Sequence, residues 1–166
     1  MNYQDSLRQA AEVSLPWERL QGKNVLVAGA TGLIGGTVVD VLMHRKPLDF
    51  DVYACGRNEE RARRRFAACW TNPHFHFLKH DVTRLLEGSE DFHFVIDAAS
   101  GASPQLYVSD PAGIVRANIL GVDALLERGR HHHLEKFVYV ASGEVYGEGD
   151  GRAFTEDYSG DVDPMS

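Results

Sequence analysis

The stretch KNVLVAGATGLIGG, residues 23–36, decides the fold of this chain. An apolar run ends on Gly29, glycines recur at Gly32 and Gly35, and a helical rhythm of apolar residues begins at Thr37. This order predicts a strand, a tight turn and a helix. Such a turn points backbone N–H groups and the positive end of a helix dipole at one spot, which suits a pyrophosphate.

The glycines of this turn have different expected roles. Gly29 permits the turn, Gly32 lets the backbone approach a ligand, and Gly35 lets the helix pack closely on the sheet. The spacing is GxxGxxG, not the GxGxxG of many dehydrogenases, and it is informative because a strand precedes it and a helix follows. The alternative is an ordinary glycine-rich turn. The expected coenzyme contacts here are Gly29, Thr31, Gly32, Leu33, Ile34 and Gly35.

Length and composition are those of one globular domain, with 166 residues, 43% of them apolar and 25% charged. The net charge of −7 argues against nucleic acid or an anionic membrane as a partner, because a polyanion needs a basic face. Cys55 and Cys69 have neither zinc-ligand spacing nor the density of a disulfide scaffold. Since no signal-peptide pattern or membrane-length apolar stretch is present, we expect a cytoplasmic protein.

The rest of the chain alternates between strand and helix patterns. Residues 1–21 predict an N-terminal helical extension, with a short helix and then an extended segment anchored by Trp17, covering a sheet edge or a helix face. Further strands are expected at 51–55, 74–78, 92–97 and 136–141, and helices up to His44, over 58–70 and over 111–130. Right-handed βαβ units then predict an α/β fold of Rossmann type, a doubly wound parallel sheet of order 3-2-1-4-5.

The end of the second predicted strand is where a dinucleotide site distinguishes a ribose hydroxyl from a 2′-phosphate. NAD sites usually place an acid there, whereas this chain has Gly56, Arg57 and Asn58. An arginine fork suits a phosphate, which favours NADP, although arginine can also stack on adenine in an NAD site. The alternative is that Arg57 merely starts a solvated helix whose first charges are Glu59 and Glu60.

Other candidates lie at the ends of the later strands, beyond which a ligand is expected near the switch point between the first and fourth strands. Asp81 could accept a hydrogen bond from the adenine amino group of a coenzyme, while Val82 packs on the adenine ring. The alternative is that Asp81 only caps a helix over residues 83–87. The small residues Ala98, Ala99 and Ser100 leave room for the ribose and nicotinamide.

Asn118 and the histidines are two further features whose role the sequence does not assign to a ligand. Asn118 interrupts the apolar stripe of the 111–130 helix, so it either ties neighbouring strand ends together or lies at the surface. The histidines at 74, 76 and 131–133 are expected at the surface, because three consecutive residues converge poorly on one ion and a helix C-terminus favours cations. No metal site is expected.

With these residues in place, the chain resembles the extended short-chain dehydrogenase/reductase family, the epimerases, dehydratases and decarboxylases of nucleotide sugars. The resemblance covers residues 23–166 and implies a nicotinamide coenzyme, NAD or NADP, and a nucleotide-sugar substrate. Its motifs are GATGLIG at 29–35, Asp81-Val82, the small residues at 98–100, the Asn118 helix and SGEVYG at 142–147.

Within that family, two stretches are similar to the UDP-glucuronate decarboxylases: ASGASPQLYVSDP at 99–111 and FTEDYSGDVDPMS at 154–166. The resemblance implies that Ser142 bonds the substrate and the catalytic tyrosine, and that Glu144 is the acid shared with 4,6-dehydratases. Gly143 replaces the aspartate usual in dehydratases, which counts against dehydration. The implied reaction is oxidation at C4, loss of carbon dioxide and re-reduction.

The family's YxxxK pair, in which tyrosine is the general base and lysine lowers its pKa, is absent. Tyr146 and Tyr158 have no lysine four residues on. We therefore expect residues 22–166 to be an NAD(P)-binding domain truncated before that pair and the substrate lobe, its sheet incomplete at the C-terminal side and inactive alone. The intact enzyme would be a homodimer. A 4-epimerase, 4,6-dehydratase or reductase, or a non-catalytic dinucleotide-binding protein, are the alternatives.

Overall fold

Five parallel strands form one sheet in the computed structural model, which describes residues 2–101, 103–149, 151–160 and 162. The strands are β1 (Asn24–Ala28), β2 (Asp51–Gly56), β3 (Phe75–Lys79), β4 (Phe94–Asp97) and β5 (Lys136–Tyr139). Their order is β3-β2-β1-β4-β5, and each pair of neighbours is parallel. The predicted fold class and strand order are confirmed.

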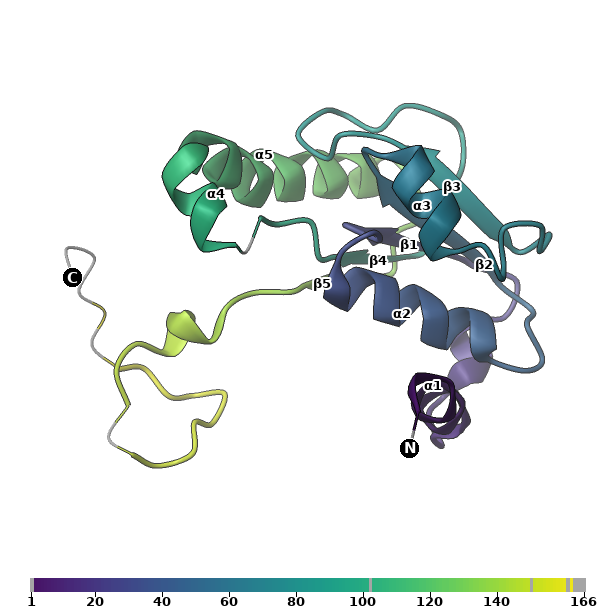
Figure 1. Ribbon diagram of the computed structural model, residues 1–166, viewed down its shortest axis with the longest axis horizontal. Coiled ribbons are helices and arrows are strands. Elements are labelled where there is room, and N and C mark those ends of the chain that lie inside the picture. Colours follow the sequence, from purple (N-terminus) through teal and green to yellow (C-terminus); the bar gives the residue numbers. More distant parts are fainter. Residues whose placement is uncertain (1, 102, 150, 161, 163–166) are drawn as a thin grey trace.

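Helices cover both faces of the sheet (Figure 1). They are α1 (Tyr3–Glu12), α2 (Leu33–His44), α3 (Glu59–Arg65), α4 (Pro104–Ser109) and α5 (Pro111–Arg130), with short 3-10 helices η1 (Trp17–Leu20) and η2 (Gly143–Tyr146). α2 and α3 pack on one face and α5 packs on the other. Parallel neighbours require such crossovers because each strand must start at the same edge as the last.

β1 is apolar throughout because both of its faces are covered. Val25 and Val27 belong to the cluster beneath α2, and Leu26 and Ala28 belong to the cluster beneath α5. This alternation follows from the period of two along a strand. β1 therefore carries the packing of both layers, and the turn that follows it begins from a rigid base.

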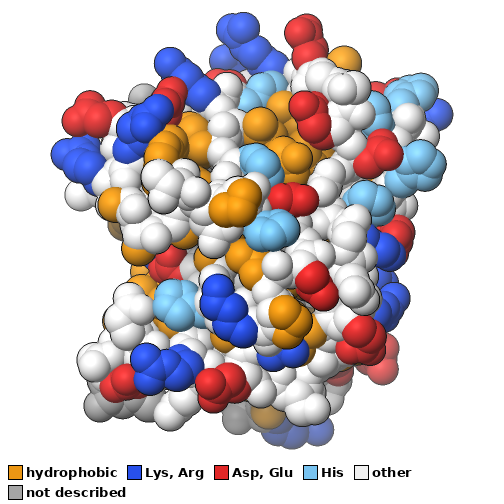
Figure 2. Space-filling model, turned by 90° about the vertical axis from the view of Figure 1, so that its right-hand side faces the viewer, with side chains coloured by type: hydrophobic (Ala, Val, Ile, Leu, Met, Phe, Trp, Pro, Cys, Tyr) orange, Lys and Arg blue, Asp and Glu red, His pale blue; other side chains and the backbone are white. Residues whose placement is uncertain are grey.

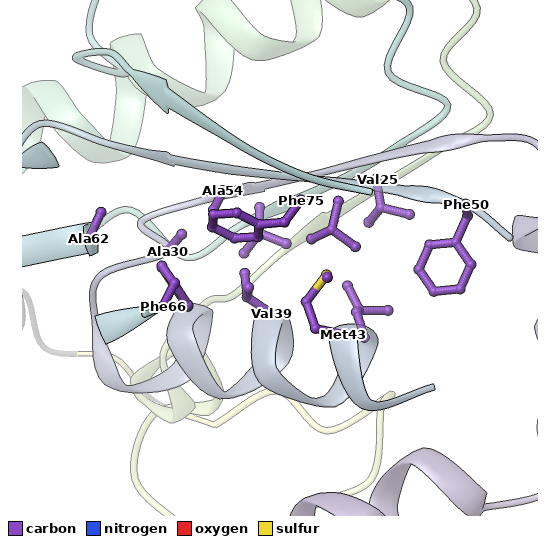
Figure 3. Close-up of a cluster of buried hydrophobic side chains, with 12 residues drawn as sticks. Val25, Ala30, Val39, Met43, Phe50, Ala54, Ala62, Phe66 and Phe75 are labelled. Carbon is purple, nitrogen blue, oxygen red and sulfur yellow. The ribbon is translucent and has the colours of Figure 1, made fainter. Parts of the chain in front are cut away.

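The cluster between α2 and the sheet fixes the direction of that helix (Figure 3). Val39 and Met43 of α2 face Val25 and other strand side chains. Phe50 and Phe66 are each only 1% exposed. Burying a side chain of this size contributes about 1.5–3 kcal/mol, so these two rings are main anchors of the layer.

The N-terminal extension covers a helix face, as the sequence predicts. Leu7 and Ala11 are buried, and Tyr3 donates its hydroxyl proton to Asp40 of α2. The segment after α1 differs from the prediction, because Trp17 begins η1 rather than an extended stretch. Its Nε1 donates to the carbonyl oxygen of Val13 over 2.8 Å, which bends the chain locally.

α3 is shorter than predicted. The helix ends at Arg65, and residues 66–71 form turns. Phe66 leaves the helix to enter the core, where its ring lies 5.3 Å from that of Phe75. At the end of α3, Arg65 forms an ion pair with Asp40 of α2.

The helix considered for residues 83–87 is absent, so the account of Asp81 as a helix cap is wrong. Instead, Arg128 of α5 is 7% exposed and holds the loop that replaces the helix. Its Nη1 donates to the carbonyl oxygens of Leu86 (2.8 Å) and Gly88 (2.9 Å), and its Nη2 donates to that of Glu90 (2.7 Å). The three carbonyl groups therefore bond to the Arg128 side chain instead of to backbone N–H groups of a helix.

α4 was not predicted. Ser103 caps it by accepting a hydrogen bond from the Leu106 N–H over 3.3 Å, and Pro104 occupies its first position. Two strands are also shorter than predicted, since β4 begins at Phe94 and β5 ends at Tyr139. The additional helix separates the end of β4 from the start of α5.

The predicted apolar stripe of α5 is only partly buried. Leu125 is 2% exposed, whereas Val115 and Ile119 are 56% and 62% exposed. On β5, Val138 and Tyr139 are also 47% and 43% exposed. Beyond β5 the described chain leads away from the sheet (Figure 1). Within the 154–166 stretch, residues 161 and 163–166 lie outside the described residues.

Candidate functional site

The glycine turn, residues 29–35, connects β1 to α2 and packs against the end of β4. Gly29 has φ +69°, where a side chain would be strained, and a β-carbon there would overlap the carbonyl oxygen of Ala98. At Gly35 a β-carbon would lie 2.5 Å from the carbonyl oxygen of Gly29. The turn therefore requires both glycines. Gly35 admits the backbone of the turn itself, rather than the sheet as the sequence predicts.

Gly32 differs from those two glycines because its position is open. Its φ of −79° is ordinary, and the nearest atom to a β-carbon there would be the Gly29 carbonyl oxygen at 3.2 Å. Gly32 is also the N-cap of α2 and provides no side-chain cap. The first N–H groups of a helix have no acceptor within it. This end of the helix therefore presents N–H donors to the space over the turn.

Leu33 and Ile34 flank this opening. Their side chains are 88% and 54% exposed, unlike the other apolar residues of the first half of α2. Exposed aliphatic side chains beside free backbone donors form a surface that suits a ligand with both charged and apolar parts.

The glycine turn lies at the topological switch point of the sheet. Ala30 N–H donates to the Cys55 carbonyl oxygen at the end of β2 over 3.0 Å, and Ala98 N–H donates to the Ala28 carbonyl oxygen over 3.1 Å. Thr31 packs against Gly56, where a β-carbon would lie 3.5 Å from the Thr31 Cγ2. The turn is thus joined to both neighbouring strand ends, where open α/β sheets bind ligands.

The predicted residues after β2 have separate environments. Arg57 is exposed and precedes α3, which begins at Glu59. Asn58 is the N-cap of α3, and its Oδ1 accepts from the Arg61 N–H over 2.8 Å. That oxygen therefore serves the helix, which leaves Arg57 as the charged group at this strand end.

Asp81 and Val82 follow β3. Asp81 Oδ1 accepts from the N–H (3.1 Å) and the hydroxyl (2.9 Å) of Thr83. The Thr83 N–H is the main cause that lowers the pKa of Asp81, with smaller contributions from Arg57 and Arg84. Val82 packs toward Gly121 of α5, with its Cγ2 3.2 Å from where a β-carbon would stand. Asp81 therefore stays ionised beside Arg57.

A hollow of about 400 Å³ opens at these strand ends. Its lining residues are Arg57, Lys79, His80, Asp81 and Arg84. The structure thus brings together Arg57 and Asp81, which the sequence predicts as site residues, and adds Lys79 and Arg84, which sequence reasoning missed. A larger hollow of about 520 Å³ along β3 contains none of the predicted site residues.

The end of β4 contains a buried acid that sequence reasoning missed. Asp97 is 1% exposed, and its Oδ1 accepts from the Ala99 N–H over 3.0 Å. Burial raises the pKa of Asp97. This contact shapes the turn in which Ala98 faces Gly29, with Ser100 exposed beyond it. An acid that ends an apolar strand before small residues is the signal that could have identified it.

Asn118 links α5 to one strand end, whereas the first of its two predicted roles was to tie neighbouring strand ends together. Its Oδ1 accepts from the hydroxyl of Tyr139, the last residue of β5, over 3.2 Å. The side chain is partly buried. A direct contact between Asn118 and a coenzyme stays a prediction.

The residues expected to act on substrate lie apart from the turn. Ser142 caps η2, and its Oγ accepts from the Glu144 N–H over 3.3 Å. Both side chains are exposed. η2 stands away from the sheet in Figure 1, and among the described residues no hydrogen bond joins it to the glycine turn. The structure thus assembles the coenzyme candidates but not the substrate candidates.

Histidines and carboxylates gather at the opposite edge of the sheet, where the strands begin (Figure 2). His74 and His76 are half-exposed rather than fully at the surface. His76 Nε2 is hydrogen-bonded to Asp51 Oδ1 over 3.0 Å, whereas His74 Nδ1 lies 3.3 Å from the same oxygen without making a hydrogen bond. The ring of His76 stacks on that of Tyr53, with 4.5 Å between centroids. These contacts hold neighbouring strands together.

Asp91 joins the helix–strand connection after α5 to this edge. Its carboxylate lies 2.7 Å from His133 Nδ1 and 3.0 Å from His132 Nδ1, and these two partners lower the pKa of Asp91 to about 2.

Across the described part of the chain, no group of three or more His, Cys, Asp or Glu residues is arranged to hold a metal ion. Nor does that part contain a helix long and apolar enough to cross a membrane.

The glycine turn fits the diphosphate of a dinucleotide coenzyme. Gly29 lets the turn come close to the end of β4, Gly35 lets α2 come close to the turn, and Gly32 keeps the donors of α2 accessible. Negative charge is favoured at such a helix start. An aliphatic or branched residue at the open position would fill the space that a phosphate needs.

Comparison with known proteins agrees with this geometry. Residues 25–166 match the model of the NAD dependent epimerase/dehydratase family. The chain is 30% identical over 149 residues to UDP-glucuronic acid decarboxylase 2 of Arabidopsis thaliana, covering 87% of this chain and 31% of that protein. It is 27% identical over 146 residues to UDP-glucuronic acid decarboxylase 1 of Danio rerio, covering 86% and 33%. The chain thus spans about a third of the length of these relatives.

Solved structures share the fold. A UDP-glucuronic acid 4-epimerase from Bacillus cereus in complex with NAD superposes with a TM-score of 0.64 at 24% identity, covering 86% of this chain and 46% of that one. A dTDP-glucose 4,6-dehydratase from Bacillus anthracis in complex with NAD gives a TM-score of 0.66 at 20% identity, with the same two coverages.

Proposed function

Because the chain belongs to the NAD dependent epimerase/dehydratase family, we propose that it is the coenzyme-binding part of an enzyme that modifies a nucleotide sugar. The observation that carries the proposal is the glycine turn at the switch point, where the uncapped start of α2 faces open space. Gly29 to Gly35 would hold the diphosphate, and Ala98, Ala99 and Ser100 would border the nicotinamide ribose. The coenzyme is NAD or NADP.

The reaction we propose is decarboxylation of a nucleotide-linked uronic acid. The decarboxylases from plants and fish support this choice, because the chain is 27–30% identical to them. When bound, the nicotinamide would take a hydride from sugar C4 and return it after carbon dioxide has left. A 4-keto sugar with a carboxylate on C5 is a β-keto acid, which loses carbon dioxide as its C–C bonding electrons pass to the ketone.

Residues of this chain would position that sugar. Ser142 would donate to or accept from the C4 hydroxyl, and Glu144 would assist at C5 or orient the substrate. Both are exposed, so they are accessible to a second lobe or a ligand. Since no tyrosine of residues 136–166 has a lysine four residues on, we expect the 166-residue chain alone to turn over no substrate.

Alternatives within the family are a 4-epimerase, a 4,6-dehydratase and a reductase. Solved structures of an epimerase and of a dehydratase share the fold of this chain, which is why these reactions stay as alternatives. Gly143, in place of an aspartate, supports the decarboxylase over a dehydratase. A non-catalytic dinucleotide-binding protein is the alternative of another class.

Gly32→Val tests the proposal at the open position of the turn. A β-carbon there would require the Gly29 carbonyl oxygen, 3.2 Å away, to shift by a few tenths of an ångström, and the valine would block the phosphates. We expect at least about a 100-fold loss of affinity for NAD and NADP, because several charge-assisted hydrogen bonds are lost together.

Isothermal titration calorimetry would measure both affinities, and circular dichroism would report the fold. Gly143→Val is the control, since no atom lies within 4 Å of a β-carbon there. Undiminished binding by Gly32→Val, or no binding by the unaltered chain, would refute the proposal.

A further inference from the structure

Asp97 is a buried acid that has no role in the proposed chemistry. It is the last residue of β4, and its side chain is only 1% exposed. Acidic side chains are almost never buried to this degree unless a cation or several donors accompany them. Among the described residues, the Ala99 N–H at 3.0 Å is the one hydrogen-bond donor to this carboxylate, and no ion pair includes Asp97. Its negative charge is therefore left without a partner of opposite charge.

The described elements around Asp97 supply no compensating charge. Its register partner on β1 is an alanine, and its partner on β5 is Tyr139, whose hydroxyl donates to Asn118 of α5. Cys55 of β2 interacts electrostatically with Asp97, but burial raises the pKa of its thiol to about 12, so this group stays neutral. Asp81, which follows β3, acts on the same thiol and is itself an acid. The groups around Asp97 are thus neutral or negative.

The carboxylate is held beside the place proposed for the nicotinamide ribose. On one side of β4, the Ala98 N–H donates to the Ala28 carbonyl oxygen over 3.1 Å. On the other side, the Val140 N–H donates to the Asp97 carbonyl oxygen over 2.9 Å. The main chain is thus bonded to both neighbouring segments, and the Asp97 side chain is bonded to the small-residue segment that follows. Asp97 cannot turn away from that segment without breaking these hydrogen bonds.

A coenzyme bound as proposed would bring the missing positive charge to this place. The nicotinamide ring is a cation in the oxidised coenzyme and is neutral in the reduced one. On the proposed function, we infer that Asp97 makes the site select the oxidised coenzyme over the reduced one, because its carboxylate compensates the charge of the oxidised ring. Two opposite charges attract more strongly inside a protein than in water, since the effective dielectric constant there is lower.

This preference suits the reaction proposed above. That reaction begins with oxidation of the sugar, so a site that favours the oxidised coenzyme is loaded with the form it needs. The Asp97 carboxylate loses its compensation whenever the ring is neutral. Asp97 therefore also opposes accumulation of the reduced coenzyme.

Removing the charge of Asp97 without removing its acceptor tests this inference. Asp97→Asn keeps an oxygen that can accept from the Ala99 N–H. In calorimetric titrations at pH 8, chosen as about the pH that keeps the carboxyl ionised, this variant should bind NAD about 3- to 10-fold more weakly, the effect of one unit charge acting across roughly 10 Å of protein. Its affinity for NADH should stay within about twofold of the unaltered chain, because the reduced ring is neutral. ADP-ribose, which lacks the nicotinamide, should behave as NADH does.

Two further variants complete the experiment, with circular dichroism to report the fold of each. Asp97→Ser is a second neutral variant, whose hydroxyl can accept from the same N–H, and it should show the same selective loss of NAD affinity. Asp123→Asn is the matched control, because it makes the same substitution at an exposed position of α5. Its affinities for all three ligands should be unchanged.

The unaltered chain also tests the inference by itself, because it should bind NAD more tightly than NADH. Tighter binding of NADH, or undiminished binding of NAD by the folded variants at Asp97, would overturn the inference and leave the proposed function standing. Equal losses for NAD, NADH and ADP-ribose would mean that Asp97 only maintains the shape of the site, which would overturn it as well. Binding of neither dinucleotide by the unaltered chain would instead refute the proposed function.

Discussion

Replacing Gly35 by alanine should destabilise the fold, although alanine normally favours a helix. The added β-carbon would lie 2.5 Å from the carbonyl oxygen of Gly29, 2.9 Å from its carbonyl carbon and 3.2 Å from the Ala30 Cα. All three atoms belong to the main chain and cannot rotate away. Either α2 must move off the turn or the turn must open, and both changes disturb the junction with β4.

The magnitude follows from two opposing effects. Alanine gains up to about 1 kcal/mol over glycine within a helix. Overpacking typically costs about 1–3 kcal/mol, and rigid contacts on this scale fall at the upper end. The expected net loss is about 2 kcal/mol of unfolding free energy. For a chain of this size, that lowers the melting temperature by about 4–8 °C.

Gly36→Ala is the matched control, because it lies in the same helical turn and gains the same propensity. Its β-carbon would meet the Ala30 carbonyl oxygen at 3.1 Å and the flexible Arg65 guanidinium at 3.2 Å. Its stability should therefore change by less than about 0.5 kcal/mol, because the propensity gain offsets a small adjustment. Urea unfolding followed by circular dichroism measures both variants. If the two lose the same stability, or Gly35→Ala loses none, the tight turn is not what requires glycine.

Two more predictions concern the contacts of Arg128 with the 86–90 loop and those of Asp91 with its histidine partners. Arg128→Leu should lower the unfolding free energy by about 2–4 kcal/mol in urea titrations, because three loop carbonyls lose a charged donor; an unchanged midpoint would show that the 86–90 loop holds itself. The pKa of Asp91 falls from 3.8 to about 2 on folding, so its ionised form stabilises the protein above pH 4 and that stabilisation is lost toward pH 2. Asp91→Asn should therefore unfold earlier than the unaltered chain at pH 5, and the gap should narrow on acidification; a gap independent of pH would contradict the pairing with His132 and His133.

The sheet could be predicted because each strand has a strong local signal. β1 is apolar on both faces, and Gly29 follows it directly, so strand, turn and helix were identified together. The alternation of strands and helices then left few possible topologies. α4 was missed because six residues show no clear period, although Ser103 followed by Pro104 is a recognisable helix start.

Other features depend on contacts between distant residues. The end of α3 at Arg65 is set by burial of Phe66 against Phe75, and periodicity cannot separate a last helical turn from a series of turns. The loop at 86–90 depends on an arginine about 40 residues later.

In the candidate site, too, residues with a local sequence signal could be predicted and residues placed by contacts between distant segments could not. The glycines and Arg57 were identified from local motifs. Lys79 and Arg84 were not, because each looks like an ordinary surface charge until the pairing of β2 with β3 places it beside Arg57.

The central position of β1 has a consequence for synthesis on the ribosome. β1 gains its second neighbour only through pairing such as Val25 with Phe94, and the glycine turn closes only against Ala98. At translation rates of about 5–20 residues per second, roughly 3–14 s separate the emergence of these partners. During that interval the nascent chain exposes an unpaired apolar strand edge, so we expect it to need chaperone protection before it is able to bind a dinucleotide.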